Sequence, residues 1–213
     1  MLLQSLMTPQ LPPVFRYPLD DGTPILVRPL QPQDAPRLRE GFKRLSGLAR
    51  RRRFLDEAGE LTDARIADVL ASDPENRCAW GAANLEKPDE PGIGIARFTR
   101  LNGEPQAADV AIVITDEYQG RGAGFVLQAC LHLTAHARGI RTFYYDVHSE
   151  NDRIIKHLKL LGALHAGRAD NIDRLMLPVY HRAWDIPAGN QIGKRFAEVF
   201  RRLQKVEIFR EAA

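Results

Sequence analysis

The sequence is poor in cysteine, in long apolar runs and in net charge. Its only two cysteines, Cys78 and Cys130, lie in apolar segments, which excludes a disulfide-built fold and predicts reduced core thiols. No window approaches the length of a membrane span, and the opening residues lack the features of a signal peptide, so we expect a cytoplasmic location and no membrane partner. The formal net charge is only +3. This value argues against a nucleic-acid partner but allows an anionic ligand.

The overall composition is that of an ordinary globular protein. The chain has 213 residues, of which 44% are hydrophobic and 27% are charged. This length is sufficient for a sizeable core, and this composition is unlike that of a disordered chain. We therefore expect one globular unit with extensions.

The most informative stretch covers residues 108–124 and reads ADVAIVITDEYQGRGAG. An alternating, largely β-branched segment precedes the glycine triplet Gly120, Gly122 and Gly124, and a long amphipathic segment follows it, which predicts a strand, a turn and a helix start. Glycines at this spacing remove the Cβ atoms that would keep a ligand off the backbone, so several N–H groups can face one anion. The natural ligand of such a loop is a phosphate or a pyrophosphate.

Three phosphate-binding patterns compete for this loop. A Walker loop requires a Lys and a hydroxyl residue after its last glycine, and neither is present. A dinucleotide fingerprint requires a third glycine three residues after Gly122, where Phe125 stands. The segment resembles the Gln/Arg-x-x-Gly-x-Gly/Ala signature of the GNAT N-acyltransferases, whose loop holds the pyrophosphate of acetyl-CoA; the matching residues are Gln119, Gly120, Arg121, Gly122, Ala123 and Gly124. The alternative is a glycine-rich turn without a ligand.

Turn and helix signals along the chain agree with this resemblance. Asp21-Gly22 predicts a hairpin, Asp34 and Thr62 predict helix starts, and Gly139 and Gly162 predict helix ends. The resemblance implies a mixed α/β GNAT fold with a central sheet of about seven strands, a splayed fourth and fifth strand pair, and flanking helices. We expect a tail over residues 1–13, the GNAT domain over 14–185 and a C-terminal amphipathic helix over 186–213.

A second segment suggests a subgroup of the family. Leu45-Ser46, followed by Arg50, Arg53 and Phe54, resembles part of the GNAT domains of bacterial protein lysine acetyltransferases. Asp21-Gly22-Thr23 and Val27-Arg28-Pro29 fit the same subgroup in the same order along the chain. The alternative for the arginine run is a solvated helix face.

Acetyl transfer to an amine requires a base, because a lysine with a pKa near 10.4 is neutral only about once in 10³ to 10⁴ molecules at pH 7. In the family a glutamate proposed as the general base stands at the position that matches Asp109. Asp109 is one C–C bond shorter than glutamate, so we expect it to act through a water molecule. The alternative is a solvated strand residue.

The general acid is less clear from the sequence. Many family members carry a tyrosine on the helix after the fifth strand, and the matching residue here is Leu158. His148, His157 or solvent could protonate the departing thiolate instead, and we take His148 as the candidate. His132 and His136 have the spacing of a metal-binding pair but lie off the predicted buried helix face, so we expect surface residues and no metal site.

The resemblance also implies the cofactor contacts. Gln119, Arg121, Gly122 and Gly124 would meet the pyrophosphate, and the backbones of Ile112 and Ile114 would pair with the pantetheine arm. An exposed N–H near Val113 or Ile114 would stabilise the oxyanion. Further contacts are expected from the residues at the start of the next helix: Asn151 to pantetheine, and Arg153 and Lys156 to the adenosine phosphate.

The sequence therefore predicts an acetyltransferase that moves acetyl from acetyl-CoA to a primary amine, most simply a protein lysine. Two alternatives stay open: a small-molecule amine acetyltransferase, and an acetyl-CoA-binding regulatory module with little or no catalysis. The C-terminal amphipathic helix predicts either packing on its own domain or a homodimer contact.

Overall fold

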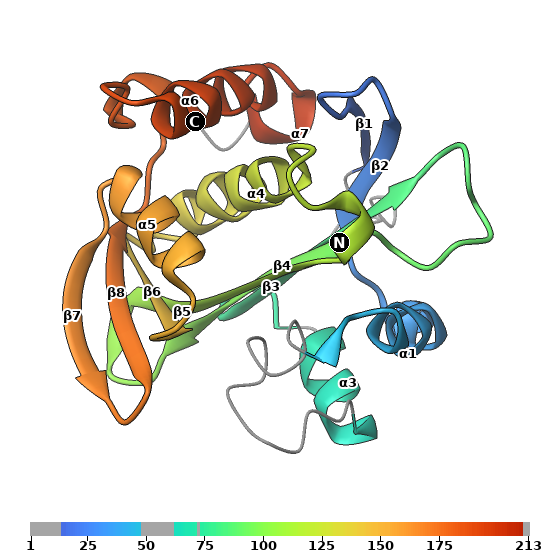
Figure 1. The fold of residues 1–213 in the computed structure, drawn as a ribbon, viewed down its shortest axis with the longest axis horizontal. Coiled ribbons are helices and arrows are strands. Elements are labelled where there is room, and N and C mark those ends of the chain that lie inside the picture. The colour runs from blue at the N-terminus through green and yellow to red at the C-terminus, as the bar shows by residue number, and fades with distance from the viewer. Residues whose placement is uncertain (1–13, 48–61, 72, 211–213) are drawn as a thin grey trace, which may run out of the picture.

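The computed structural model describes residues 14–47, 62–71 and 73–210. The predicted tail and the run Arg50 to Phe54 lie outside these residues. A single sheet of eight strands, one more than the seven expected, runs in the order β1-β2-β3-β4-β5-β6-β8-β7 (Figure 1). The strands are β1 Phe15–Pro18, β2 Pro24–Pro29, β3 Arg77–Asn84, β4 Gly94–Leu101, β5 Glu104–Ile114, β6 Thr142–His148, β7 Leu164–Ala169 and β8 Ile172–Pro178. Neighbouring strands are antiparallel except β5 and β6, which are parallel.

Helices cover both faces of the sheet. On one face lie α1 (Ala35–Lys43) and α3 (Asp63–Leu70), and on the other lies α4 (Ala123–Ala137), with α6 (Gln191–Leu203) packed on its far side (Figure 1). Helix α5 (Asp152–Leu160) contacts α6 and β8, and the short helix α7 (Glu207–Arg210) ends the described chain. No helix within the described ranges has the length and apolarity needed to span a membrane. The mixed α/β class predicted from the sequence is confirmed.

Helix α4 is the centre of the core. Eleven of its fifteen residues are buried, because the sheet covers one side and α6 covers the other. The surface position expected for His132 is therefore wrong: its side chain is fully buried, and its Nδ1 accepts a hydrogen bond of 3.0 Å from the backbone N–H of Tyr180. Burial lowers the pKa of His132 to about 3, so the ring is neutral.

Helix α6 buries the apolar stripe predicted from the sequence within the chain itself. Phe196, Phe200 and Leu203 are fully buried in the core that includes α4. Asn190 caps the helix through a 2.9 Å hydrogen bond from the Gly193 N–H, and its amide donates to the Leu160 carbonyl at 2.8 Å. A homodimer through this helix stays a prediction, and it would have to use the outer face of α6.

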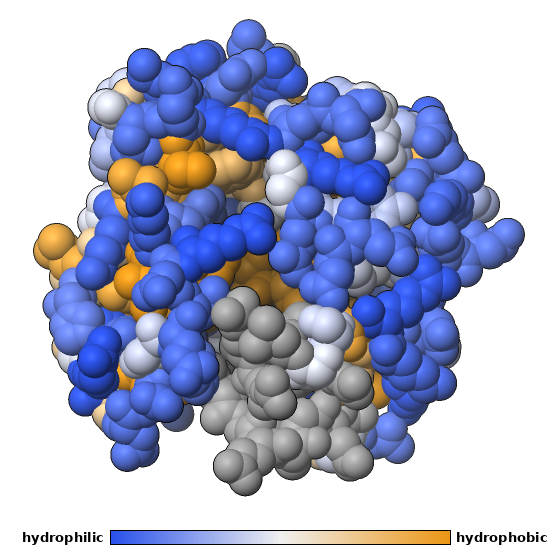
Figure 2. Space-filling model, in the orientation of Figure 1, coloured by the Kyte–Doolittle hydropathy of each residue, from blue (hydrophilic) through white to orange (hydrophobic). Residues whose placement is uncertain are grey.

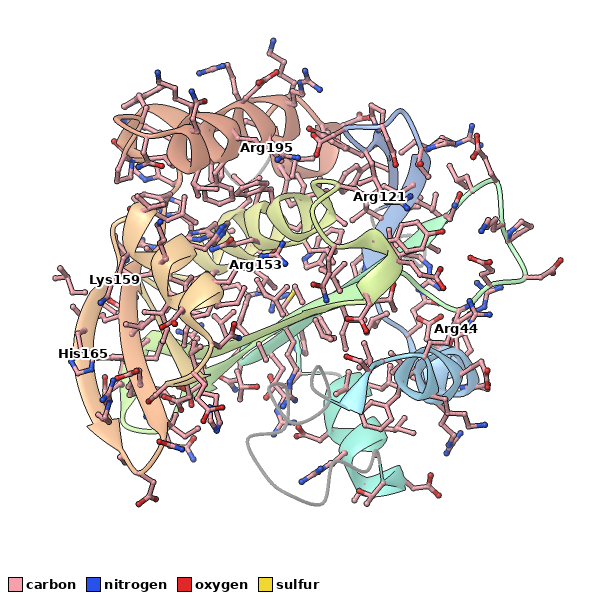
Figure 3. The ribbon with its side chains drawn as sticks, in the orientation of Figure 1. Arg44, Arg121, Arg153, Lys159, His165 and Arg195 are labelled. Atoms are coloured by element: carbon pink, nitrogen blue, oxygen red, sulfur yellow. The ribbon has the colours of Figure 1, made fainter. Side chains whose placement is uncertain are left out.

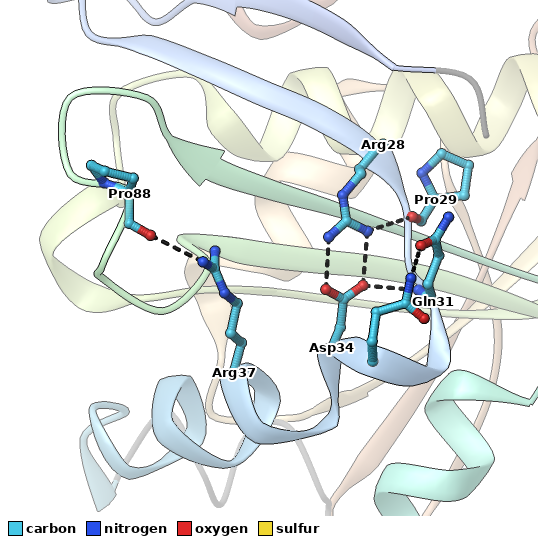
Figure 4. A network of polar contacts seen from close by, with 7 residues as sticks. Arg28, Pro29, Gln31, Asp34, Arg37 and Pro88 are labelled. Carbon is cyan, nitrogen blue, oxygen red and sulfur yellow. Dashed lines mark hydrogen bonds and ion pairs between the residues drawn. The ribbon is translucent and has the colours of Figure 1, made fainter. Parts of the chain in front are cut away.

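Helix α1 is fixed to the sheet by polar contacts rather than by apolar burial. None of its residues is buried. Just before the helix, Asp34 receives two hydrogen bonds of 2.7 and 2.8 Å from Arg28 of β2, and one of 2.8 Å from the Gln31 N–H (Figure 4). Burial raises the pKa of the Asp34 carboxyl, but these hydrogen bonds outweigh it and leave the pKa below its ordinary value. The predicted cap at Thr62 is confirmed at the start of α3, where its hydroxyl accepts from the Arg65 N–H.

Candidate active site

The parallel strands β5 and β6 separate in the middle of the sheet. They pair only from Ala107 to Asp109, whereas β5 continues to pair with β4 as far as Ile114. The Gln106 carbonyl accepts a hydrogen bond on the β6 side of β5, and the Thr115 N–H donates a hydrogen bond on the β4 side. Because backbone groups alternate in direction along a strand, the N–H groups of Ile112 and Ile114 face the gap. By the same alternation the N–H of Val113 faces β4. Between the two predicted oxyanion donors, the geometry therefore favours Ile114.

The glycine loop ends at the N-terminus of α4. Gly120 and Gly122 have φ angles of +79° and +97°, which glycine adopts without strain. No side chain caps α4, so N–H groups of its first turn lack a side-chain acceptor. A Cβ on Gly124 would meet only the Ile114 side chain, at 3.9 Å, so packing within the protein does not require glycine there. The loop thus leaves a cradle beside an uncapped helix start, where an anion is stabilised.

A cleft of about 820 Å³ runs from this loop along the separated strands. Its floor is apolar and its rims are hydrophilic, and Figure 2 shows a hollow of this kind. Most of the predicted cofactor residues line the cleft: Ile112, Val113, Ile114, Gln119, Gly120, Gly122, Gly124, Asn151, Arg153 and Lys156. The volume, the apolar floor and the basic side chains of Arg153 and Lys156 suit an elongated thiol ester with phosphates at one end.

Two predicted residues do not line the cleft with their side chains. Arg121 turns toward the β1–β2 hairpin, where its guanidinium lies 3.2 Å from an Asp21 oxygen and over the Tyr118 ring. Ala123 is fully buried in the core. Both can serve a ligand through their backbone N–H groups alone. Gln119 lines the cleft, and its side-chain amide donates to the Ile114 carbonyl at 3.2 Å.

Asp109 lies at the last paired position before the strands separate. Its side chain is about half exposed and accepts a 2.5 Å hydrogen bond from Arg174 of β8. Arg174 also lies 3.7 Å from Asp146 and over the Tyr144 ring. Burial raises the pKa of Asp109, Asp146 adds to the rise, and together they outweigh the lowering effect of Arg174. A raised pKa brings a carboxylate closer to the range of a useful base.

The two histidines proposed as acids differ in position. Among the described residues that line the cleft, His157 is present and His148 is not. The Nδ1 of His148 instead accepts a 3.4 Å hydrogen bond from the Glu150 N–H. His157 packs against the Phe125 ring, and burial lowers its pKa, so it is a poor proton donor at neutral pH. Within the described residues no group of three or more His, Cys, Asp or Glu side chains could hold a metal ion.

Sequence reasoning missed several residues that line the cleft. Tyr145 and Gln128 form a buried pair in which the Gln128 amide donates to the Tyr145 hydroxyl at 3.3 Å. Ile192 and Arg195 reach the cleft from α6. The sequence predicted an amphipathic helix in this region, but nothing local in the sequence places Arg195 beside the glycine loop.

Comparison with known proteins identifies the family and the fold. A family model described as "Acetyltransferase (GNAT) domain" matches residues 25–163. The chain belongs to the GNAT acetyltransferase family. The GNAT family uses acetyl-CoA as cosubstrate, and the chain is an N-acetyltransferase.

Named relatives agree with this assignment. The chain is 34% identical over 140 residues to acetyltransferase PA5475 of Pseudomonas aeruginosa, which covers 66% of this chain and 74% of that one. It is 30% identical over 138 residues to acetyltransferase Pat of Mycolicibacterium smegmatis, covering 65% of this chain but only 40% of Pat. Among solved structures, the GNAT domain of S. lividans PAT matches with a TM-score of 0.71 and 25% identity, over 78% of this chain and 96% of that domain.

Proposed function

We propose that this GNAT protein acetylates a lysine side chain of another protein, with Asp109 as the general base acting through a water molecule. The observation that carries the proposal is the position of Asp109 at the point where β5 and β6 separate. A carboxylate there lies on the same strand as the gap-facing N–H of Ile112, three residues further on. Base and oxyanion donors on one strand are what amine attack on a thioester requires.

The residues of the cleft fit acetyl-CoA. The uncapped start of α4 and the cradle at Gly124 suit its pyrophosphate. The free edge of β5 at Ile114 suits the amide groups of the pantetheine arm, and Asn151 at the start of α5 adds a side-chain amide. Arg153 and Lys156 on α5 suit the remaining phosphate. Bound acetyl-CoA supplies an activated acetyl group as a thioester.

In this mechanism each protein group has one task. Asp109 takes a proton from the lysine ammonium through water, and the neutral nitrogen then forms a bond to the acetyl carbon. The Ile112 N–H, which faces the same gap as that of Ile114 and is the nearer of the two to Asp109, donates to the carbonyl oxygen as it becomes negative. The carbon–sulfur bond breaks, and solvent protonates the thiolate. His148 does not line the cleft, and burial lowers the pKa of His157, so neither is suited to this step. The second proton of the nitrogen leaves to solvent.

A lysine acceptor is supported by charge and by likeness. Asp109 of β5 and Asp146 of β6 are two partly exposed carboxylates that share the single guanidinium of Arg174, so the negative charge that is left over attracts an ammonium group. The likeness to the GNAT domain of S. lividans PAT, a protein acetyltransferase, supports a protein acceptor. The experiment is an acetyl-CoA turnover screen over lysine-containing proteins, polyamines and amino acids. Turnover with proteins supports the proposal, and turnover with polyamines or amino acids alone would replace it with a small-molecule transferase.

The base is tested with Asp109→Asn. We expect turnover to fall by about 10²- to 10⁴-fold. In the wild type the rate rises with pH as Asp109 loses its proton, with the acidic limb above the ordinary aspartate value because the pKa is raised; the variant should lack this limb. Asp170→Asn, in the β7–β8 turn, is the control. An unchanged rate and pH profile in Asp109→Asn would exclude Asp109 as the base. If the wild-type protein bound CoA but turned over none of the acceptors, it would be a regulatory module.

A further inference from the structure

We propose that Arg195, on helix α6, is a phosphate ligand of the cofactor site and contacts the pyrophosphate of CoA. This inference rests on the proposed use of acetyl-CoA. Helix α6 lies beyond residues 25–163 that match the GNAT family model. The C-terminal helix would thus contribute a ligand-binding residue to the active site in addition to packing against α4.

The first support is the position of α6. Ile192 and Arg195, one turn into the helix, line the same cleft as the glycine loop. The helix is held rigidly: Phe196 is fully buried, and a Cβ on Gly193 would overlap the Pro187 carbonyl. Figure 3 shows Arg195 on the side of α6 that faces α4. A side chain on such a scaffold keeps its direction at low entropic cost.

The second support is what the guanidinium touches. Arg195 lies 5.2 Å from the centre of the Phe125 ring, in the first turn of α4, and forms an ion pair with Asp20 of the β1–β2 hairpin. The Oδ2 atom of Asp20, which makes this ion pair, is also 2.8 Å from where a Cβ of Gly122 would stand. Arg195 therefore lies beside the glycine loop, at the place proposed for the pyrophosphate.

The third support is the balance of charges. The ion pair with Asp20 is exposed, with 39% of the Arg195 side chain and 51% of the Asp20 side chain accessible, so breaking it costs little. A pyrophosphate has two anionic groups, and a planar guanidinium binds a pair of phosphate oxygens with two parallel hydrogen bonds. Arg195 would therefore leave Asp20 for the pyrophosphate. The neighbouring Arg121 is paired with Asp21 and stays on the hairpin.

The test is calorimetric binding of three ligands to Arg195→Gln: CoA, dephospho-CoA without the 3′-phosphate, and pantetheine without any phosphate. We expect affinity for CoA and for dephospho-CoA to fall on the order of tenfold, and affinity for pantetheine to stay unchanged. Arg195→Lys, which keeps the charge but loses the planar fork, should lose less. Lys194→Gln, an exposed residue of the same helix, is the control and should bind as the wild type does.

A second variant separates ligand contact from structural support. Asp20→Asn releases Arg195 and removes a carboxylate from the loop, so CoA should bind about two- to fivefold more tightly. Weaker binding by Asp20→Asn, no loss in Arg195→Gln, or a loss that disappears with dephospho-CoA would each overturn the proposal. If wild-type protein bound CoA but Arg195→Gln bound it equally well, only this inference would fail. If wild-type protein bound no CoA, the proposed function would fail as well.

Discussion

The two faces of the sheet are built by different means. On one face α4 is buried nearly throughout, and α6 covers it with fully buried aromatic side chains. On the other face α1 has no buried residue, and an apolar cavity of about 140 Å³ lies between α1, α3 and the sheet. Polar contacts hold this second face together, among them the pair of Arg28 with Asp34 and the pair of Arg39 with Asp63.

This difference matches the two tasks of an acetyltransferase. The packed face carries the glycine loop and α5, the elements that we propose bind the one unchanging cosubstrate. The loosely packed face adjoins Val113, which lines both the cavity and the cleft. A face held by polar contacts can adjust to an acceptor at low cost, because each exposed ion pair contributes only about 1 kcal/mol or less.

The largest expected effect contrasts one residue from each face. Phe196→Ala removes a fully buried ring between α6 and α4, so the free energy of unfolding should fall by about 3–5 kcal/mol. Leu38→Ala, on α1 beside the cavity, removes a side chain that is only partly buried, and it should cost less than about 1.5 kcal/mol. Urea unfolding followed by circular dichroism measures both. Equal losses would show that the two faces are packed alike.

The next effect concerns the polar contacts of the loosely packed face. Asp34→Asn leaves Arg28 without its carboxylate, and we expect a loss of about 1–3 kcal/mol at pH 7. Because the pKa of Asp34 is lowered in the folded state, its stabilisation is present above pH 4 and is lost as the pH falls through the folded pKa. The variant should therefore lose less stability than the wild type on acidification. Asp63→Asn, whose side chain is 86% exposed, is the control and should change stability by under about 1 kcal/mol.

Local signals predicted much of the cofactor side. The glycine loop and the hairpin turn at Gly22 have positive φ angles, and the glycines at these positions are a local signal that can be recognised in the sequence. His132 was misplaced because a periodic pattern reveals one buried helix face, whereas α6 buries a second. The pair of Asp109 with Arg174 joins residues 65 positions apart, and that of Arg195 with Asp20 joins opposite ends of the chain. No local pattern encodes such contacts, so the charge environment of the candidate base came only from the structure.

A third test asks whether CoA binding requires an accessible backbone at the glycine loop, independently of how the loop packs within the protein. Gly124→Ala places a methyl group in the cradle of the loop, where the protein itself has room for it. Because alanine favours a helix over glycine, the free protein should gain up to about 1 kcal/mol, while CoA binding should weaken about tenfold. Gly41→Ala in α1 has similar room, 3.6 Å from Pro91, and should stabilise the protein without affecting CoA. A Gly124→Ala protein that kept full CoA affinity would exclude the cradle as the pyrophosphate site.

The smallest expected effect tests whether a single side chain sets the chemistry on the acceptor side. Arg174 is the group that opposes the raised pKa of Asp109, so Arg174→Gln should raise that pKa further. The acidic limb of kcat/KM should then move to higher pH, with a few-fold loss on the acidic limb that recovers as the pH rises. Lys159→Gln, exposed on α5, is the control and should leave the profile unchanged. An acidic limb that stayed in place would mean that the ionisation of a group other than Asp109 governs turnover.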